Sequence, residues 1–359
     1  RLITSFFSIV TIILTSLIAR DYFSEKTSVL SALFLIFSPW FLVASLQLDI
    51  VGSFLTCFYM FSLFFYLKFL DNNKLKYIVL SGIAAGFSLL TNYGAALLFP
   101  TIFLHYMYNL CKQHDFTYST FLRICFIFVS SATIIFAIFP VWSFFVGSPT
   151  FVNSVTHTFD LMMADPGSGL RPSEGTNLIL LIIQYLNALV WIGPLLLFTL
   201  ILSLLDSDKQ NNRVKNIFLI QIIIVLIFFT FVIKDNFRPI EKYLLVLAPG
   251  LSILSANYLK KLFFKKKEIL LLVILFLLTV LSFNILSVMS DQYISFYPKQ
   301  NYLSAALNLT WNVKVPLLGH AGPIGFYTSL NVILISFIAS FIISVFYFIF
   351  RLEPVAKYL

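Results

Sequence analysis

Long apolar runs, separated by short polar segments, organise this chain. A helix needs about 20 mostly apolar residues to cross the hydrocarbon core of a membrane. On that criterion the sequence predicts eleven crossings, some of them short: 2–19, 28–46, 50–69, 77–91, 94–110, 121–146, 177–204, 217–233, 243–259, 269–289 and 326–350. We expect Pro39 to interrupt the second run, because proline breaks the hydrogen-bond ladder of a helix. The fourth and fifth runs meet at a break formed by Thr91, Asn92 and Tyr93.

Composition supports a membrane protein and excludes other classes. Hydrophobic residues make up 60% of the chain, charged residues 11%, and the mean hydropathy is +0.95. Soluble domains average roughly 45–50% apolar and about 25% charged residues. A chain this apolar cannot stay solvated as a disordered coil either. We therefore predict an all-α polytopic membrane protein that forms a single transmembrane domain over residues 1–359.

The charged residues divide unevenly between the two sides of this topology. One set of alternate loops holds 17 of the 24 basic and eight of the 15 acidic residues, so it carries the whole net charge of +9. Lys and Arg accumulate in cytoplasmic loops, so this side is predicted to be cytoplasmic. The basic surplus is then a signal of orientation and of anionic lipid rather than of nucleic acid. These loops are 20–27, 68–76, 111–123, 205–216, 260–268 and the tail after 350.

This orientation places residue 1 outside the cytoplasm and the C-terminus inside. We expect an N-terminal truncation, with at least one helix and its outer loop preceding Arg1, because an outside start requires a cleaved signal or an earlier span. The outer segments 147–176 and 290–325 are long, whereas all inner loops are short. The outer face is therefore the predicted working face, in the plasma membrane or the endoplasmic reticulum.

Asp49 is the first candidate for chemistry. It lies at an outer membrane boundary, and the nearest cation that follows it in sequence is Lys68. An uncompensated carboxylate in a membrane is costly, so such residues are usually paired, hydrated or functional. The alternative is a helix cap, because a carboxylate suits the positive end of the helix that begins near Ile50.

A cluster of cations in KDNFRPIEKYLLVLAPG is the second candidate. Lys234, Arg238 and Lys242 lie within nine residues on the predicted outer face, against the charge rule. Arg and Lys are the usual side chains for binding phosphate, which would explain their position. The alternative is pairing with Asp235 and Glu241 together with contacts to lipid headgroups.

Three further features have weaker signals. Small residues between Gly82 and Ala96 predict close helix packing more readily than a site. His105 lies inside a span and is predicted to be structural. His157, with Asp160 and Asp165, could form a metal or acid–base site, but HTFDLMMAD has no specific ligand spacing. The three cysteines form no metal or disulfide pattern.

In their order along the chain, four motifs resemble the GT-C glycosyltransferases of the protein O-mannosyltransferase and aminoarabinose-transferase (ArnT-like) type. The resemblance covers roughly residues 1–260. It rests on RLITSFFSIVTIILTSLIARDYFSEKTSVLSALFLIFSP, on Asp49 in LQLDIVGSFL, on GIAAGFSLLTNYGAALLFP, and on the pattern RxxxKYLLxxxP from Arg238 to Pro249. A departure is Asn92, where many members place a lysine.

The resemblance implies a GT-C architecture with extracytoplasmic loops and an inverting transfer of a sugar from a polyprenyl phosphate to an acceptor protein or glycolipid. It implies that Arg238 and Lys242, with Tyr243 nearby, bind the donor phosphate. Asp49 would orient the acceptor or assist the main catalytic carboxylate, which family members carry in an earlier loop. Asn92, Tyr93, His157 and Asp165 are expected substrate contacts. A divalent metal remains open, because a monophosphate donor needs less charge neutralisation.

Two other classes of protein stay open on the sequence alone. A lipid-linked sugar transporter or flippase would use a similar body, but it predicts paired ionisable residues deep within the spans and inverted repeats. A non-catalytic membrane assembly subunit would not need cations on the outer face. Loss of sugar transfer on substitution of Arg238 and Lys242 would favour the enzyme.

Overall fold

The computed structural model describes the N-terminal half of the chain almost continuously and shorter parts of the rest. The described residues are 2–36, 38, 41, 44–45, 50–113, 117–163, 192, 196, 199–201, 212–228, 244–262, 314–316, 327–329, 338 and 342. Predictions that fall on other residues lie outside this part of the chain.

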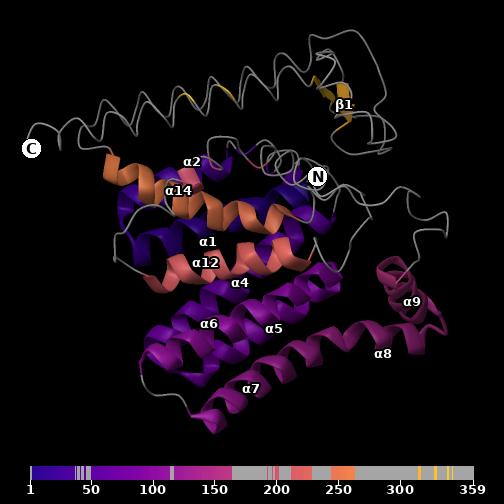
Figure 1. Ribbon diagram of the computed structural model, residues 1–359. Helices are drawn as coiled ribbons and strands as arrows, with labels where there is room; N and C mark the ends of the chain where they lie inside the picture. The colour runs from indigo at the N-terminus through magenta and orange to yellow at the C-terminus, as the bar shows by residue number, and fades with distance from the viewer. Residues whose placement is uncertain are drawn as a thin grey trace, which may run out of the picture.

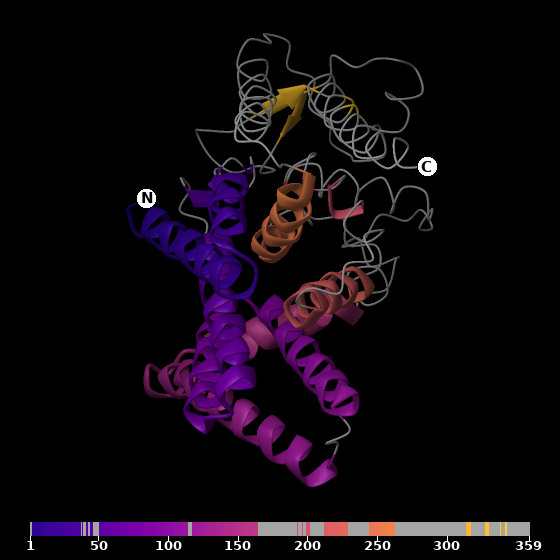
Figure 2. The same cartoon turned by 90° about the vertical axis from the view of Figure 1, so that its left-hand side faces the viewer.

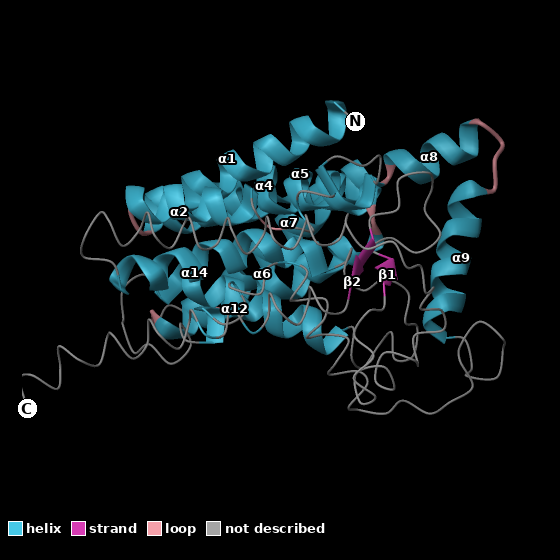
Figure 3. Ribbon diagram, turned by 90° about the horizontal axis from the view of Figure 1, so that it is seen from above, coloured by secondary structure: helices cyan, strands magenta, loops and turns pink. Residues whose placement is uncertain are grey.

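Helices form nearly all of the described structure, and most of them lie lengthwise beside one another (Figure 1), whereas α9 (Thr150–Met163) runs across one end of the bundle (Figure 3). Two short 3-10 helices, η1 (Tyr93–Leu97) and η3 (Leu245–Leu247), lead directly into α6 and α14. The α-helices are α1 (Leu2–Tyr22), α2 (Glu25–Ile36), α4 (Ile50–Asn72), α5 (Leu75–Thr91), α6 (Leu98–Lys112), α7 (Tyr118–Phe136), α8 (Ile138–Phe145), α9 (Thr150–Met163), α12 (Asn212–Ile227) and α14 (Ala248–Leu262).

Each of the first six predicted spans contains a helical segment, although α2 covers only the first part of the span 28–46. Three described helices are long and apolar enough to cross a membrane by themselves: Leu2–Tyr22, Gly52–Asn72 and Tyr118–Phe145. The protein is therefore a multi-pass integral membrane protein. The predicted spans 177–204, 269–289 and 326–350 lie wholly or largely outside the described residues, so the number of crossings stays a prediction.

Prolines mark the interruptions in these helices. α2 ends at Ile36 and Ser38 is not helical, which confirms the expected interruption around Pro39. α7 ends at Phe136, four residues before Pro140, and α8 begins after a turn at Ala137. A proline ring clashes with the carbonyl group four residues earlier, which explains a helix end at this point.

Two segments that the sequence predicts as outer loops contain secondary structure within their described residues. The segment 147–176, expected as a loop, contains the 14-residue helix α9. β1 (Lys314–Pro316) pairs antiparallel with β2 (Tyr327–Ser329), with Val315 opposite Thr328. The described part of the chain is thus helical apart from this two-stranded ladder, and residues 327–329, near the start of the expected span 326–350, form a strand instead of a helix. Hydropathy measures burial and does not distinguish a short strand from the start of a helix.

Small residues set the packing of α5 against α7. A Cβ atom added at Gly82 would lie 2.5 Å from the Phe128 carbonyl oxygen, and one at Gly86 would lie 2.6 Å from that of Ala132. The contacts advance together along both helices, so α5 and α7 run parallel. The predicted close packing of this stripe is confirmed.

Hydroxyl groups join neighbouring helices inside the bundle. Ser8 of α1 donates a hydrogen bond to Ser53 of α4 at 3.0 Å. Ser62 of α4 and Ser81 of α5 lie 3.0 Å apart, and Ser81 also donates to the Ser62 carbonyl. Lipid offers no hydrophobic force between helices, so such bonds and close packing hold them together.

His105 joins three helices in the same way. Its Nε2 lies 2.8 Å from the Arg213 carbonyl oxygen of α12, and its Nδ1 lies 2.9 Å from the Tyr66 hydroxyl of α4. A carbonyl group only accepts, so Nε2 carries the proton and Nδ1 accepts from Tyr66. The ring is fully buried, which confirms the predicted structural role.

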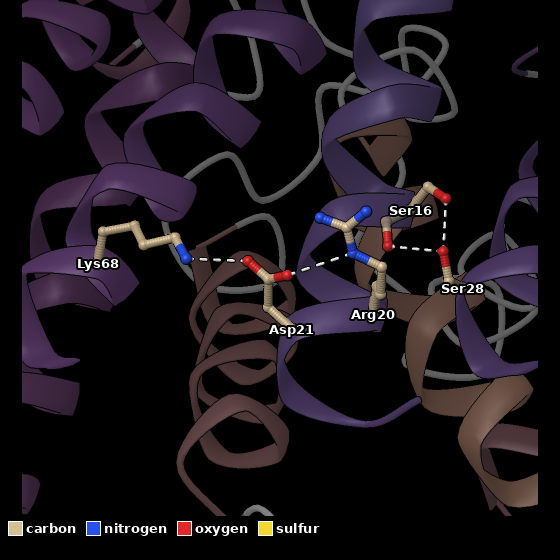
Figure 4. Close-up of polar contacts among 5 residues, drawn as sticks. All are labelled: Ser16, Arg20, Asp21, Ser28 and Lys68. Atoms are coloured by element: carbon tan, nitrogen blue, oxygen red, sulfur yellow. Dashed lines mark hydrogen bonds and ion pairs between the residues drawn. The ribbon is translucent and has the colours of Figure 1, made fainter. Parts of the chain in front are cut away.

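All Lys and Arg residues of the described helices lie at one end of the bundle, on the left in Figure 1 and facing the viewer in Figure 2. We call it the basic end. There Asp21 of α1 pairs with Lys68 of α4 at 2.9 Å and with Arg20 at 3.5 Å (Figure 4). Tyr22 donates to Asp71, and Ser16 bonds to Ser28 at 2.6 Å. Loops that were assigned to one side of the membrane from charge alone therefore meet in space.

Gly86→Leu is expected to lower the free energy of unfolding by about 1–3 kcal/mol, because the new side chain collides with the backbone of α7. The thermal melting temperature of the purified protein in neutral lipid measures the change. Leu80→Phe adds bulk on the exposed side of the same helix and is the matched control, expected to alter stability by less than about 0.5 kcal/mol. Equal melting temperatures for the two variants would contradict the close contact.

Candidate functional site

The predicted site residues fall into three groups with respect to the structure. Asn92 and Tyr93 are described with their side chains, and the backbone of His157 lies in α9. Five predicted residues lie outside the described part of the chain: Asp49, Asp165, Arg238, Lys242 and Tyr243. The site is therefore built from the described residues that flank them.

The first of these flanking segments surrounds Asp49. Ser45 lies before it, and its carbonyl oxygen accepts hydrogen bonds from Thr4 at 3.2 Å and Ser5 at 2.9 Å of α1. Ser53 lies after it, in the first turn of α4, and donates to the Ala44 carbonyl at 2.9 Å. These bonds fix the chain on both sides of Asp49 against the first turns of α1.

The second segment follows Lys242 and Tyr243. Leu244 is fully buried and begins the turn into η3. A Cβ atom added at Gly52 would lie 3.3 Å from Leu245 Cδ2 and 2.9 Å from Ala44 Cβ. The start of α4 and the chain just after Lys242 therefore lie side by side, and the absence of a side chain at Gly52 permits this approach.

Gln221 of α12 holds the second segment in place. Its buried side-chain amide donates to the Val246 carbonyl at 3.0 Å. Four residues later, Gly250 approaches the ring of Phe218. Because the contacts advance in opposite directions along the chain, α14 runs antiparallel to α12 and returns from this end to the basic end.

The third segment is the break at Asn92. α5 ends at Thr91, and Asn92 adopts an extended backbone conformation. Its side-chain oxygen accepts from the Gly94 backbone N–H at 2.7 Å, while the Ala95 N–H donates to its carbonyl at 3.0 Å. Asn92 thus caps η1, a local role that its position before Gly94 favours.

Tyr93 connects this break to α9. Its hydroxyl lies 3.0 Å from Ser154 Oγ, and its ring meets Phe136 edge-on at 6.3 Å. Phe151 of α9 packs edge-on against Phe136 and Phe139. Helix α9, which carries His157, is therefore docked at the end of the bundle opposite the basic end, as Figure 3 shows from above.

We call this opposite end the site end. None of the described helices carries Lys or Arg there, and the described residues hold no group of three or more His, Cys, Asp or Glu side chains that could bind a metal. Neither the role of Gly52 nor the contact between Tyr93 and Ser154 was predicted from the sequence. Gly52 lies three residues after Asp49 and was a visible signal, whereas the partner of Tyr93 is 61 positions away.

Comparisons with known proteins agree with the fold. Residues 1–145 match the family described as dolichyl-phosphate-mannose-protein mannosyltransferase. The structure is similar to that of ArnT from Cupriavidus metallidurans bound to undecaprenyl phosphate, with a TM-score of 0.55 and 17% sequence identity over 86% of this chain and 54% of that chain. Apo ArnT gives a TM-score of 0.54 and 18% identity over 86% of this chain and 53% of that one.

The chain thus spans about half the length of these ArnT structures. Among curated proteins, none matches it in sequence. The structural likeness, at 17% and 18% identity, establishes a shared fold. The resemblance found in the sequence is confirmed: the chain resembles the GT-C glycosyltransferases of the protein mannosyltransferase and ArnT type.

Proposed function

We propose that this chain forms part of a membrane glycosyltransferase that moves a sugar from a polyprenyl phosphate to an acceptor protein or glycolipid, with inversion. The contact between the first turn of α4 and η3 carries the proposal, because Asp49 directly precedes the former and Lys242 and Tyr243 precede the latter. The family match over residues 1–145 and the ArnT fold support the same reaction class.

In the proposed reaction the acceptor hydroxyl attacks the anomeric carbon of the sugar. A carboxylate removes the hydroxyl proton, a new C–O bond forms, and the bond to the phosphate breaks with its electron pair on the departing phosphate oxygen. Arg238 and Lys242 stabilise that charge, with Tyr243 beside them. Asp49 orients the acceptor hydroxyl or assists the base.

Asn92, Tyr93, His157 and Asp165 are proposed as substrate contacts on the same side. The capping bond of Asn92 uses its side-chain oxygen and leaves the amide group as a donor. Asp165 lies two positions after the end of α9, which is docked on η1 through Tyr93. These residues border the break and α9 and would define the rim of the acceptor site.

The basic end is proposed to face the cytoplasm, with the C-terminus, and the site end to face outside the cytoplasm in the plasma membrane or endoplasmic reticulum. The cations gathered at one end of the described helices support this orientation.

Asp49→Asn separates the two roles weighed for this residue. Asparagine caps a helix about as well as aspartate, so the melting temperature should remain unchanged. Loss of the carboxylate should reduce transfer from mannosyl or aminoarabinosyl polyprenyl phosphate by about 100-fold or more, measured with radiolabelled donor. Full transfer activity of the Asn variant would show that Asp49 only caps the helix and takes no part in the reaction.

Lys242→Gln is expected to weaken binding of undecaprenyl phosphate by about tenfold, because it removes a charge-assisted hydrogen bond. Native mass spectrometry or a thermal-shift titration with undecaprenyl phosphate measures the affinity. Lys242→Arg keeps the charge and should retain most of the affinity, while Lys26→Gln at the basic end serves as the control. If the wild type and Lys242→Gln bound undecaprenyl phosphate with equal affinity, Lys242 would not be part of the phosphate site.

Cys111 offers a test of orientation with a native thiol. It is exposed at the basic end, whereas Cys57 is buried and Cys125 half-buried. A membrane-impermeant maleimide should label Cys111 only when the cytosolic side is opened, and Cys111→Ser should abolish the signal. Labelling of Cys111 in intact cells or in sealed right-side-out vesicles would contradict the proposed topology.

A further inference from the structure

We propose that the basic end carries a binding site for the headgroup of an anionic phospholipid, formed by Lys74, Lys76, Lys112 and Arg123. These four side chains come from the start of α5, the end of α6 and the first turns of α7. All four are exposed. The proposal concerns lipid binding at the end of the bundle opposite the proposed catalytic site and does not depend on the chemistry there.

Aromatic contacts bring these three helix ends together. Phe69, near the end of α4, packs against Tyr106 of α6 with ring centroids 5.9 Å apart. Tyr106 in turn stacks on Phe121 of α7 at 6.1 Å. The turn between α4 and α5 is tight, because Asn73 takes a left-handed backbone conformation with φ of 50°. Lys74 and Lys76 therefore begin α5 close beside this aromatic cluster.

None of these four cations is neutralised by a carboxylate that the structure describes. Asp21 is taken by Lys68 and Arg20, and Asp71 accepts a hydrogen bond from Tyr22. The positive charge of the four cations is thus available to an external anion.

Apolar side chains lie one helical turn below three of these cations. Leu80 follows Lys76 by four positions, Tyr108 precedes Lys112 by four, and Phe126 follows Arg123 by three. Residues three or four apart lie on one face of a helix. All three of these side chains are exposed, Phe126 to 73%. Each of these helices thus presents a cation directly above an apolar surface.

This arrangement fits a phospholipid better than a soluble anion. A lipid phosphate at the level of the cations would place its acyl chains along the exposed surface of Leu80 and Phe126, where lipid must lie in any case. Tyr108 and Tyr118, both exposed at this level, are typical of the membrane interface. A soluble phosphate would gain nothing from these apolar side chains. Basic residues near a membrane surface attract anionic lipid additively.

The test compares binding of phosphatidylglycerol and phosphatidylcholine to the purified protein by native mass spectrometry and by thermal shift. Two double variants, Lys74→Gln/Arg123→Gln and Lys76→Gln/Lys112→Gln, each remove two cations of the site. Lys26→Gln/Lys260→Gln removes two cations of the same end on α2 and α14 and is the matched control. Melting temperatures in phosphatidylcholine alone verify that every variant folds.

We expect the wild type and the control to bind phosphatidylglycerol equally, and each site variant to bind it about tenfold or more weakly. Binding of phosphatidylcholine should not change. An equal loss in the control would show diffuse attraction and overturn the site. Equal stabilisation by inorganic phosphate alone would overturn the assignment to lipid, as would equal binding of the two lipids by the wild type.

Discussion

The distance to which two helix backbones can approach governs the architecture of this protein. In a membrane the lipid tails are as apolar as the side chains, so helices associate through close contact and hydrogen bonds rather than by escape from solvent. Gly82 and Gly86 let α5 lie directly on the backbone of α7, and Gly52 lets α4 meet η3. The second of these contacts matters beyond stability, since it joins the two segments that flank Asp49 and Lys242.

Polar bonds then fix the register of the helices that glycine brings together. Ser53 bonds to Ser8 and to the Ala44 carbonyl, so the first turn of α4 cannot slide along α1 without breaking buried bonds. His105 performs the same role nearer the basic end, between α4, α6 and α12. An unpaired polar group costs several kcal/mol in hydrocarbon, so each such bond resists a helix shift. Close packing at both ends suits the proposed binding of a lipid phosphate near one surface.

The sequence predicted the helical class and placed helices within the first six predicted spans, because an apolar run of about 20 residues in a membrane protein usually forms a helix. It also located the break at Asn92 and the interruption near Pro39, where backbone chemistry is local. The contact of Gly52 with Leu245 and the bond from Tyr93 to Ser154 depend on distant pairings, which hydropathy does not encode. Helix α9 was not predicted, because its 14 residues are too polar to be identified as a membrane span. The pairing of β1 with β2 was not predicted, because each strand is only three residues long and gives no clear signal by itself.

The chemistry of the candidate site stays a prediction from the sequence, and the structure adds the geometry of the segments that flank it. A carboxylate at Asp49 and cations at Arg238 and Lys242 are unusual for the positions that the sequence predicts for them. The structure adds that the described helices contribute no Lys or Arg to the site end. A phosphate bound there must therefore draw its positive charge from other segments, and residues 234–242 lead directly into Leu244 beside α4. At the basic end, by contrast, each of the neighbouring described helices contributes Lys or Arg. Because the described helices place no competing cation at the site end, Arg238 and Lys242 alone would determine where a lipid phosphate binds there.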